Sequence, residues 1–407
     1  MSKTILRWIL KAADNAKSIK LNLSGKGLIS LPAGITKLTY LKILFLEGNR
    51  LNRIPAELAK LKHLQQLYLD NNRLTRIPEE LGRLSNLKIL TLSHNQLTSL
   101  PMKLGKLTHL QQLYLDNNQL THVPEELGNL ANLQELWLDN NHLKSIAAEL
   151  GWLSNLQQLY LHNNRLTHIP AEMGNLTKLL ELWLDNNNLT HLPAELRKLE
   201  NLEELYLHNN RLTRIPEELG QLSNLQILAL NDNQLTRVPS ALSKLRNLRK
   251  LHLNNNNLTD IPTELGKLKN LEELYLHNNR LTRIPQELGR LSNLQILTLD
   301  DNRLTHVPTE LSQLKDLRRL SLHNNQLSGI PMKLGRLTHL EWLSIEGNDN
   351  LTSPPPEVVK QGTGAILAHL RNNLSKSPEY LAAIIEVGGK RRTRTNTFAP
   401  IRIAHRI

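Results

Sequence analysis

Hydrophobic and polar residues alternate along this chain in one phrase that recurs many times. Each copy reads Leu-x-x-Leu-x-Leu-x-x-Asn, as in residues 64–72, and continues as x-Leu-Thr-x-Ile-Pro-x-Glu-Leu-Gly-x-Leu, as in residues 73–84. Side chains of a strand alternate between its two faces, so both leucines of Leu-x-Leu are expected in the core and the residue between them in solvent. The pattern therefore predicts one short strand in each copy.

The asparagine that closes each phrase sets the spacing of the copies. It returns every 23 residues without a slip, at Asn49, Asn72, Asn95, Asn118, Asn141, Asn164, Asn187, Asn210, Asn233, Asn256, Asn279, Asn302, Asn325 and Asn348. A degenerate copy precedes these at Leu21, with Lys26 in the asparagine position. Because an amide both donates and accepts, it can satisfy backbone groups of adjacent copies at the corner after the strand. We therefore expect the ladder of asparagines to be structural.

A single copy of this length cannot bury its leucines, and stacking of neighbouring copies supplies the core. Residues 21–353 are therefore predicted to form an α/β repeat solenoid of about 15 coils. We expect the strands to pair into a parallel sheet on the concave face. The Ile-Pro step would return the chain along the convex side, because proline fixes φ and ends strand pairing.

The two ends of a solenoid need covering, and we expect helical caps at both. Residues 1–20 are predicted to be an N-terminal capping helix, with Ile5, Trp8, Ile9 and Ala12 on one stripe. Residues 354–389 are predicted to be a C-terminal helical cap, with a closing helix over 356–374 and a short helix around 380–386. Residues 390–407 carry six Lys or Arg and no acid, and are expected to be a disordered basic tail.

Composition and charge narrow the classes of protein. Cysteine is absent, which excludes a disulfide-stapled scaffold, a Cys-ligated metal site and a thiol nucleophile. The net charge of +13 resides mainly at the ends, since residues 1–20 and 351–407 contribute +4 and +6. No stretch of 18 apolar residues predicts a membrane span, and the N-terminus has no signal-peptide core. We therefore expect a cytoplasmic protein.

The 23-residue phrase with Ile-Pro-x-Glu-Leu-Gly-x-Leu resembles the intracellular leucine-rich repeat (LRR) class of Ras-group, scaffold and Roco proteins, which implies a horseshoe fold and an interaction role. Residues 351–363 resemble the junction that follows the repeats in bacterial Roco proteins, where a Ras-like GTPase domain comes next. Here residues 384–392 offer no Gly-x-x-x-x-Gly-Lys-Ser/Thr loop to hold phosphate and magnesium. The resemblance therefore gives no ground for GTPase activity, and we expect no cofactor. Bacterial effectors with a ubiquitin-ligase domain are also similar in their repeats, but their chemistry needs a cysteine.

Aromatic residues concentrate in the outward-facing position of the predicted strands. The chain has five Trp, seven Tyr and two Phe, and eight of these occupy this one column: Phe45, Tyr68, Tyr114, Trp137, Tyr160, Trp183, Tyr206 and Tyr275. Trp342 lies two residues earlier in register. Five rings, from residue 114 to residue 206, fall on consecutive strands. Clustered exposed rings are typical of interface hot spots, although rings on adjacent strands also stabilise one another without a partner.

Acidic residues and histidines flank the same rings, at Asp116, Glu135, Asp139, His162, Glu181, Asp185, Glu204 and His208. Carboxylates beside rings suit a protein surface with Lys, Arg and apolar anchors, and would repel a phosphate backbone. No metal site is expected, because His162 and His208 lie two strands, or about 10 Å, apart. No Ser–His–acid grouping stands out from the repeat, so we expect no catalytic residues.

The sequence thus predicts a non-enzymatic scaffold that binds a protein partner, such as a small GTPase or another signalling protein, in its concave face. Three alternatives stay open: a truncated sensor arm of a Roco-like GTPase, a secreted effector that binds a host protein, and nucleic-acid binding by the basic tail. The sequence leaves the oligomeric state open.

Overall fold

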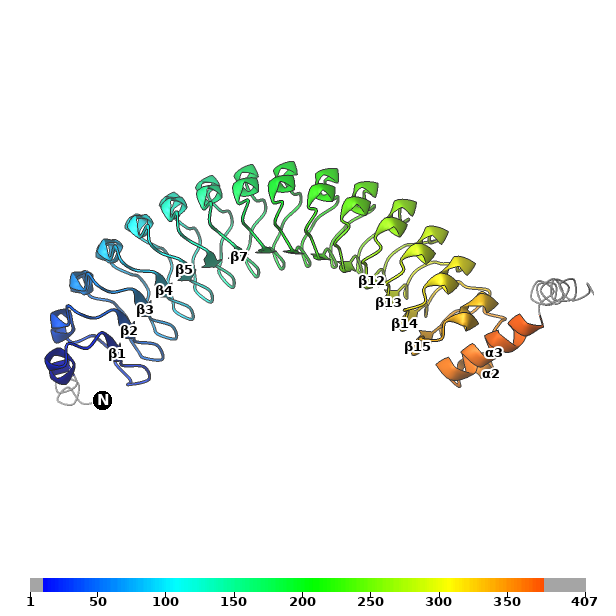
Figure 1. Ribbon diagram of the computed structural model, residues 1–407, viewed down its shortest axis with the longest axis horizontal. Helices are drawn as coiled ribbons and strands as arrows, with labels where there is room; N and C mark the ends of the chain where they lie inside the picture. The colour runs from blue at the N-terminus through cyan, green and yellow to red at the C-terminus, as the bar shows by residue number, and fades with distance from the viewer. Residues whose placement is uncertain (1–9, 377–407) are drawn as a thin grey trace, which may run out of the picture.

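The computed structural model describes residues 10–376 and confirms the predicted solenoid. Fifteen strands form one parallel sheet in which each strand pairs with its sequence neighbours. Figure 1 shows the strands along the inner side of an arc and the helical turns along its outer side. The strands are β1 (Lys20–Asn22), β2 (Ile43–Phe45), β3 (Gln66–Tyr68), β4 (Ile89–Thr91), β5 (Gln112–Tyr114), β6 (Glu135–Trp137), β7 (Gln158–Tyr160), β8 (Glu181–Trp183), β9 (Glu204–Tyr206), β10 (Ile227–Ala229), β11 (Lys250–His252), β12 (Glu273–Tyr275), β13 (Ile296–Thr298), β14 (Arg319–Ser321) and β15 (Trp342–Ser344).

On the convex side, the coils carry 3₁₀ helices of five residues each. These turns are η1 (Ala33–Lys37), η2 (Ala56–Lys60), η3 (Glu79–Arg83), η4 (Met102–Lys106), η5 (Glu125–Asn129), η6 (Ala148–Trp152), η7 (Ala171–Asn175), η8 (Ala194–Lys198), η9 (Glu217–Gln221), η10 (Ser240–Lys244), η11 (Thr263–Lys267), η12 (Gln286–Arg290), η13 (Thr309–Gln313) and η14 (Met332–Arg336). A proline precedes every turn except η6, where Ala147 takes its place. Its carbonyl accepts the first hydrogen bond of the turn, as Pro55 does from Leu58 at 3.1 Å.

The leucines of the phrase form one continuous core. Around β3, for example, Leu67 and the following Leu69 have no exposed surface, while Tyr68 between them is half-buried. Strand register is kept throughout, so that Tyr114 pairs with Trp137 and Trp137 with Tyr160. The alternation predicted from Leu-x-Leu therefore places one column of side chains on the concave surface.

The repeated asparagine holds the corner between the strand and the rest of the coil. Asn187 donates from Nδ2 to the carbonyls of Leu161 and Leu184, both at 3.0 Å, and its Oδ1 accepts from the amide of Leu166 at 2.9 Å. The residue before it, Asn186, has a φ of 53°. Asn, Asp and Gly tolerate this left-handed conformation, which explains why they dominate that position in the chain.

Glycine allows adjacent turns to stack closely on the convex side. A Cβ atom added at Gly151 of η6 would overlap the carbonyl oxygen of Glu172 in η7. The same overlap recurs at Gly128 and Gly174. Elsewhere the position holds a larger residue, such as Arg197 in η8 or Ser243 in η10. At the three glycine coils, a side chain at this position would therefore push the next turn away.

The N-terminal end of the core is covered by a helix over residues 10–15. Leu10 is buried in the core and Ala13 packs against it. Ala12 is exposed, so its assignment to the buried stripe was wrong, because Leu10 and Ala13 are the residues of this helix that face the core. The other stripe residues, Ile5, Trp8 and Ile9, lie outside the described residues.

Two helices, α2 (Pro356–Val359) and α3 (Thr363–Ser375), cover the C-terminal end. The single closing helix predicted over 356–374 was wrong, because Gly362 has a φ of 84° and breaks it. Ile366 and Leu370 of α3 are buried, and Thr363 Oγ1 accepts from the amide of Leu343 in the last strand at 2.9 Å. The helix predicted around 380–386 and the tail 390–407 lie outside the described residues.

Candidate partner-binding face

Five aromatic side chains on consecutive strands form a continuous stack on the concave face. We call this set, made up of Tyr114, Trp137, Tyr160, Trp183 and Tyr206, the aromatic ladder. Neighbouring ring centroids are 4.5, 5.2, 5.4 and 4.2 Å apart along the series. All five rings are half-buried, with one side against the sheet and their neighbours. The ladder therefore presents an apolar surface that is already ordered.

Polar side chains at the start of the strands fix two of these tyrosines. Tyr114 donates its hydroxyl to Glu135 Oε2 at 2.6 Å, and Gln112 donates to Glu135 Oε1 at 2.8 Å. The same arrangement recurs two strands later with Gln158, Tyr160 and Glu181. The glutamines were not predicted as part of the site, although their spacing from the tyrosines could have identified them.

The tyrosine hydroxyls are held in their neutral form. Burial, and then the hydrogen bond and charge of Glu135, raise the pKa of Tyr114 well above its ordinary value. The pKa of Tyr160 and that of Tyr206 are raised in the same way, by burial and then by Glu181 and Glu204 respectively. Each hydroxyl thus remains a donor to a carboxylate at neutral pH.

The three aspartates predicted to contact a partner directly are almost completely buried. Asp116, Asp139 and Asp185 are 7, 7 and 4% exposed. Asp139 Oδ2 lies 3.4 Å from His162 Nε2, and Asp185 Oδ2 lies 3.2 Å from His208 Nε2. Burial raises the pKa of Asp139, and the neighbouring His162 opposes that shift. Asp139 and Asp185 therefore orient the two histidines, and all three aspartates supply negative potential from beneath the surface.

The concave face of β5–β9 is acidic on every strand except β7. We define its concave positions as the residue before each strand, the first and third strand residues, and the second residue after the strand. The carboxylates at these positions are Asp116, Glu135, Asp139, Glu181, Asp185, Glu203 and Glu204. None of these positions in β5–β9 holds Lys or Arg.

Several buried polar atoms in the same region have no hydrogen-bond partner among residues 10–376. They are Trp137 Nε1, Trp183 Nε1, His162 Nδ1, His208 Nδ1 and Asp185 Oδ1. Each such atom costs on the order of 1–3 kcal/mol of stability. This cost is concentrated on β6–β9, beneath and beside the aromatic ladder.

The remaining predicted rings are separate from the ladder. Phe45 and Tyr68 stack on each other at 4.8 Å, and the buried Thr91 follows them in the column. The buried Ala229 ends the ladder on its other side. Beyond it, Tyr275 packs against His252 at 4.7 Å, and burial, then Glu273, raise the pKa of Tyr275 to about 12.

Trp342, at the start of β15, is 53% exposed and lies under the guanidinium of Arg319 at 5.8 Å. It lies six strands beyond the last ring of the ladder in the strand order. The structure thus brings together five of the nine predicted aromatic residues.

Models of the leucine-rich repeat family match nearly the whole solenoid. "Leucine rich repeat" matches residues 20–74, 154–212, 200–258, 246–304 and 292–349, and "Leucine-rich repeat region" matches residues 56–162. This chain belongs to the leucine-rich repeat family.

Solved structures of other LRR proteins share the fold. An LRR protein of Leptospira interrogans is 35% identical, with a TM-score of 0.76, over 86% of this chain and 96% of that one. An internalin, InlF of Listeria monocytogenes, is 26% identical, with a TM-score of 0.66, over 78% of this chain and 94% of that one. The Arabidopsis receptor kinase HAESA, solved with the peptide hormone IDA and the co-receptor SERK1, is 30% identical, with a TM-score of 0.66, over 84% of this chain and 66% of that one. Among curated proteins, none matches this chain.

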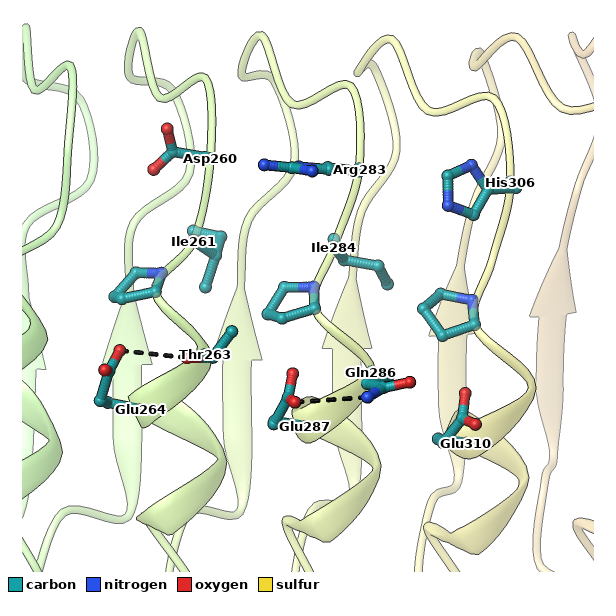
Figure 2. A pocket seen from close by; sticks show the side chains of 13 residues that line it. Asp260, Ile261, Thr263, Glu264, Arg283, Ile284, Gln286, Glu287, His306 and Glu310 are labelled. Atoms are coloured by element: carbon teal, nitrogen blue, oxygen red, sulfur yellow. Dashed lines mark hydrogen bonds between the residues drawn. The ribbon is translucent and has the colours of Figure 1, made fainter.

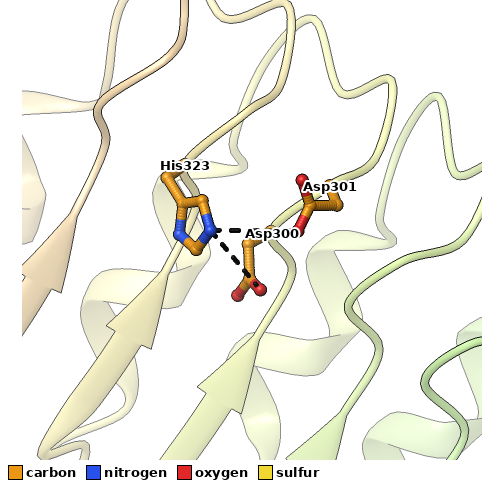
Figure 3. A group of neighbouring side chains, drawn as sticks. All are labelled: Asp300, Asp301 and His323. Atoms are coloured by element: carbon orange, nitrogen blue, oxygen red, sulfur yellow. Dashed lines mark ion pairs between the residues drawn. The ribbon is translucent and has the colours of Figure 1, made fainter.

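One group of potential metal ligands in this LRR sheet was missed by sequence reasoning. Figure 3 shows His323 facing Asp300 and Asp301 of the preceding coil. Its Nε2 lies 3.8 Å from an oxygen of each carboxylate, and the three ligand atoms lie within 4.8 Å of one another. His323 Nδ1 is 3.0 Å from the Ser344 hydroxyl. The sequence hypothesis considered only His162 and His208, which each pair with one aspartate.

The outer surface of the LRR solenoid offers a shallow hollow of about 690 Å³ beside η11–η13. Figure 2 shows that it is built from equivalent positions of successive coils, with Asp260, Arg283 and His306 in one row and Glu264, Glu287 and Glu310 in another. Polar groups do not converge there, because each row repeats at the spacing of the coils. None of the helices between residues 10 and 376 combines the length and apolarity that crossing a bilayer requires.

Proposed function

We propose that this protein is a non-enzymatic scaffold that binds a protein partner through the aromatic ladder of its concave face. The single observation that carries the proposal is the juxtaposition of five ordered rings with seven carboxylates and no Lys or Arg at the concave positions of β5–β9. Ordered aromatic side chains lose little conformational entropy on binding, which makes them effective anchors.

The chemistry of this face indicates the kind of partner. A protein surface with Lys or Arg around apolar side chains would complement both the carboxylates and the rings. Nucleic acid would be repelled, because a phosphate backbone needs cations in the groove. The unpartnered polar atoms of Trp137, Trp183 and His208 support the proposal, since side-chain movement on binding would give them partners.

The similarity to HAESA also supports a protein or peptide ligand, because that receptor was solved with a peptide hormone and a co-receptor. We further propose an intracellular location and a signalling partner, such as a small GTPase. The support for these two points is the absence of cysteine and the resemblance of the 23-residue phrase to intracellular LRR proteins. Fractionation of the native cell tests the location.

The test of partner binding compares two tryptophan substitutions. In the Trp137→Ala/Trp183→Ala variant, we expect affinity for the partner to fall by about 3 kcal/mol, or roughly 100-fold, because two central anchors are lost. The matched control is Trp152→Ala, since Trp152 is 58% exposed on the convex turn η6. The proteins captured from the native cell by the wild type should be lost with the double variant and kept with the control. Equal capture by all three proteins would show that the ladder is not the binding site.

A second candidate is the sensor arm of a Roco-like GTPase. It is favoured by one observation, the similarity of residues 351–363 to the junction after the repeats in bacterial Roco proteins. Sequencing the genomic DNA beside the coding region tests it: a phosphate-binding loop in the adjacent sequence would support the arm, and an unrelated neighbour would not.

A further inference from the structure

We propose that the basic segment of this same chain, residues 390–407, binds in the concave face over β5–β9 and covers the aromatic ladder. The contact goes beyond the proposed function because it needs no partner. The tail would occupy the surface that a partner uses, so that the partner must displace it.

The first support is the negative charge of the β5–β9 carboxylates, which no Lys or Arg at the concave positions of these strands neutralises. On β11 and β12, acidic residues at concave positions are paired across strands: Arg249 with Glu272 at 2.9 Å and Lys250 with Glu273 at 3.0 Å. On β5–β9 the concave positions hold seven carboxylates and no cation. Their only basic neighbours at these positions are His162 and His208. A chain with a net charge of +13 therefore has a strongly negative hollow at the centre of its sheet.

The second support is the composition of the segment. Its cations are Lys390, Arg391, Arg392, Arg394, Arg402 and Arg406, and it contains no acid. It also carries Phe398, Ile401, Ile403 and Ile407. Large apolar residues are scarce in segments that only solvate a terminus. Cations interspersed with apolar groups match a surface of carboxylates and rings, where Arg also stacks on aromatic faces.

The third support is reach. The structure follows the chain to Lys376, just after α3, which packs against η14 and β15. From β15 to β9 there are six strand spacings, or about 29 Å. Residues 377–389 alone can span about 45 Å, and residues 377–407 about 100 Å. Because the segment is tethered, its effective concentration at the sheet is in the millimolar range, so a weak contact is sufficient.

The experiment relies on the absence of cysteine from the 407 residues of this chain. Thr397→Cys provides a single site for a bimane label, whose fluorescence is quenched by a tryptophan in contact. With a local affinity in the millimolar range, about half of the molecules hold the tail bound. The label should therefore brighten about twofold when Trp137 and Trp183 are replaced by Phe, which keeps the ring stack. The same rise is expected in 1 M NaCl, where the screening length is about 3 Å.

Two further proteins complete the test. The Glu135→Gln/Glu181→Gln/Glu204→Gln variant keeps all five tryptophans and should brighten the label at Thr397→Cys by a similar factor. A label at Ser240→Cys, on the convex turn η10, should respond to none of these changes. Equal brightness of the Thr397→Cys label in the wild-type, phenylalanine and glutamine backgrounds would overturn the proposal. Quenching that disappears on dilution would overturn it too, because a contact within one chain is independent of concentration. The readout needs no partner, so it stands or falls separately from the capture experiment.

Discussion

Replacing one asparagine in the middle of the ladder should destabilise the protein far more than its size suggests. Asn187 is 8% exposed, and its side chain bonds the carbonyls of Leu161 and Leu184 and the amide of Leu166. In Asn187→Ala all three backbone groups lose a partner in the buried interior. A buried hydrogen bond contributes about 1 kcal/mol net, and a partner left unsatisfied costs about 1–3 kcal/mol. We therefore expect a loss of about 3–5 kcal/mol in the free energy of unfolding.

The assay is urea unfolding followed by circular dichroism, with the midpoint and slope fitted separately. Asn201→Ala is the matched control, because the Asn201 side chain is exposed and donates one hydrogen bond to the carbonyl of Thr177 at 2.7 Å. It should cost about 1 kcal/mol or less. A lower m-value, the slope of the unfolding free energy against urea concentration, would mean that the coils on the two sides of Asn187→Ala unfold separately. Such behaviour is expected where each coil is coupled only to its neighbours. If the two variants differ by less than about 1 kcal/mol, the buried hydrogen bonds do not stabilise the corner as argued.

Three further substitutions have defined outcomes. Gly151→Ala should cost about 1–3 kcal/mol in urea unfolding, because its Cβ overlaps the Glu172 carbonyl, whereas Gly364→Ala in α3 meets nothing and should not destabilise. Burial lowers the pKa of His252, so the folded state binds this proton less readily than the unfolded state, and stability is lost as pH falls below about 6.5. His252→Gln should make the melting temperature less dependent on pH between pH 7.5 and 5.5, and an unchanged pH dependence would contradict this. Because its pKa is raised, Tyr160 should ionise above pH 10, and Tyr160→Phe should reduce the part of the tyrosinate absorbance that appears at the highest pH. Loss of the absorbance that appears at lower pH would be inconsistent with the raised pKa.

The fold was largely predictable because one spacing dictates it. A 23-residue interval without a slip fixes the number of coils, the strand register and the column that faces solvent, as Leu67 and Tyr68 illustrate. The closing helix was less predictable, since its break at Gly362 depends on how the chain meets the last coil. The N-terminal helix departs from its predicted stripe at Ala12, because Leu10 and Ala13 pack against the core instead.

For the site, the sequence predicted which side chains share a column on the concave face, but it did not predict how deeply each side chain is buried. Pairing of Tyr114 with Trp137 follows directly from the register. The sequence does not show that Asp185 is buried while Glu203 is exposed, because both depend on the side chains packed around them. Nor does the repeat alone indicate that His323 meets Asp300 and Asp301, since that contact joins different positions of two coils.

The glycines of the convex turns influence the curvature of the concave face on the opposite side of the solenoid. Strand pairing holds the inner sides of the coils at one fixed separation, so the bend of the arc follows from how far apart the outer turns stand. Gly128, Gly151 and Gly174 let those turns approach behind the aromatic ladder, because a Cβ atom there would overlap the carbonyl group of the next turn. A larger residue at one of these positions would push the outer turns apart and so change the radius of the hollow that a ligand meets, without altering a single contacting side chain.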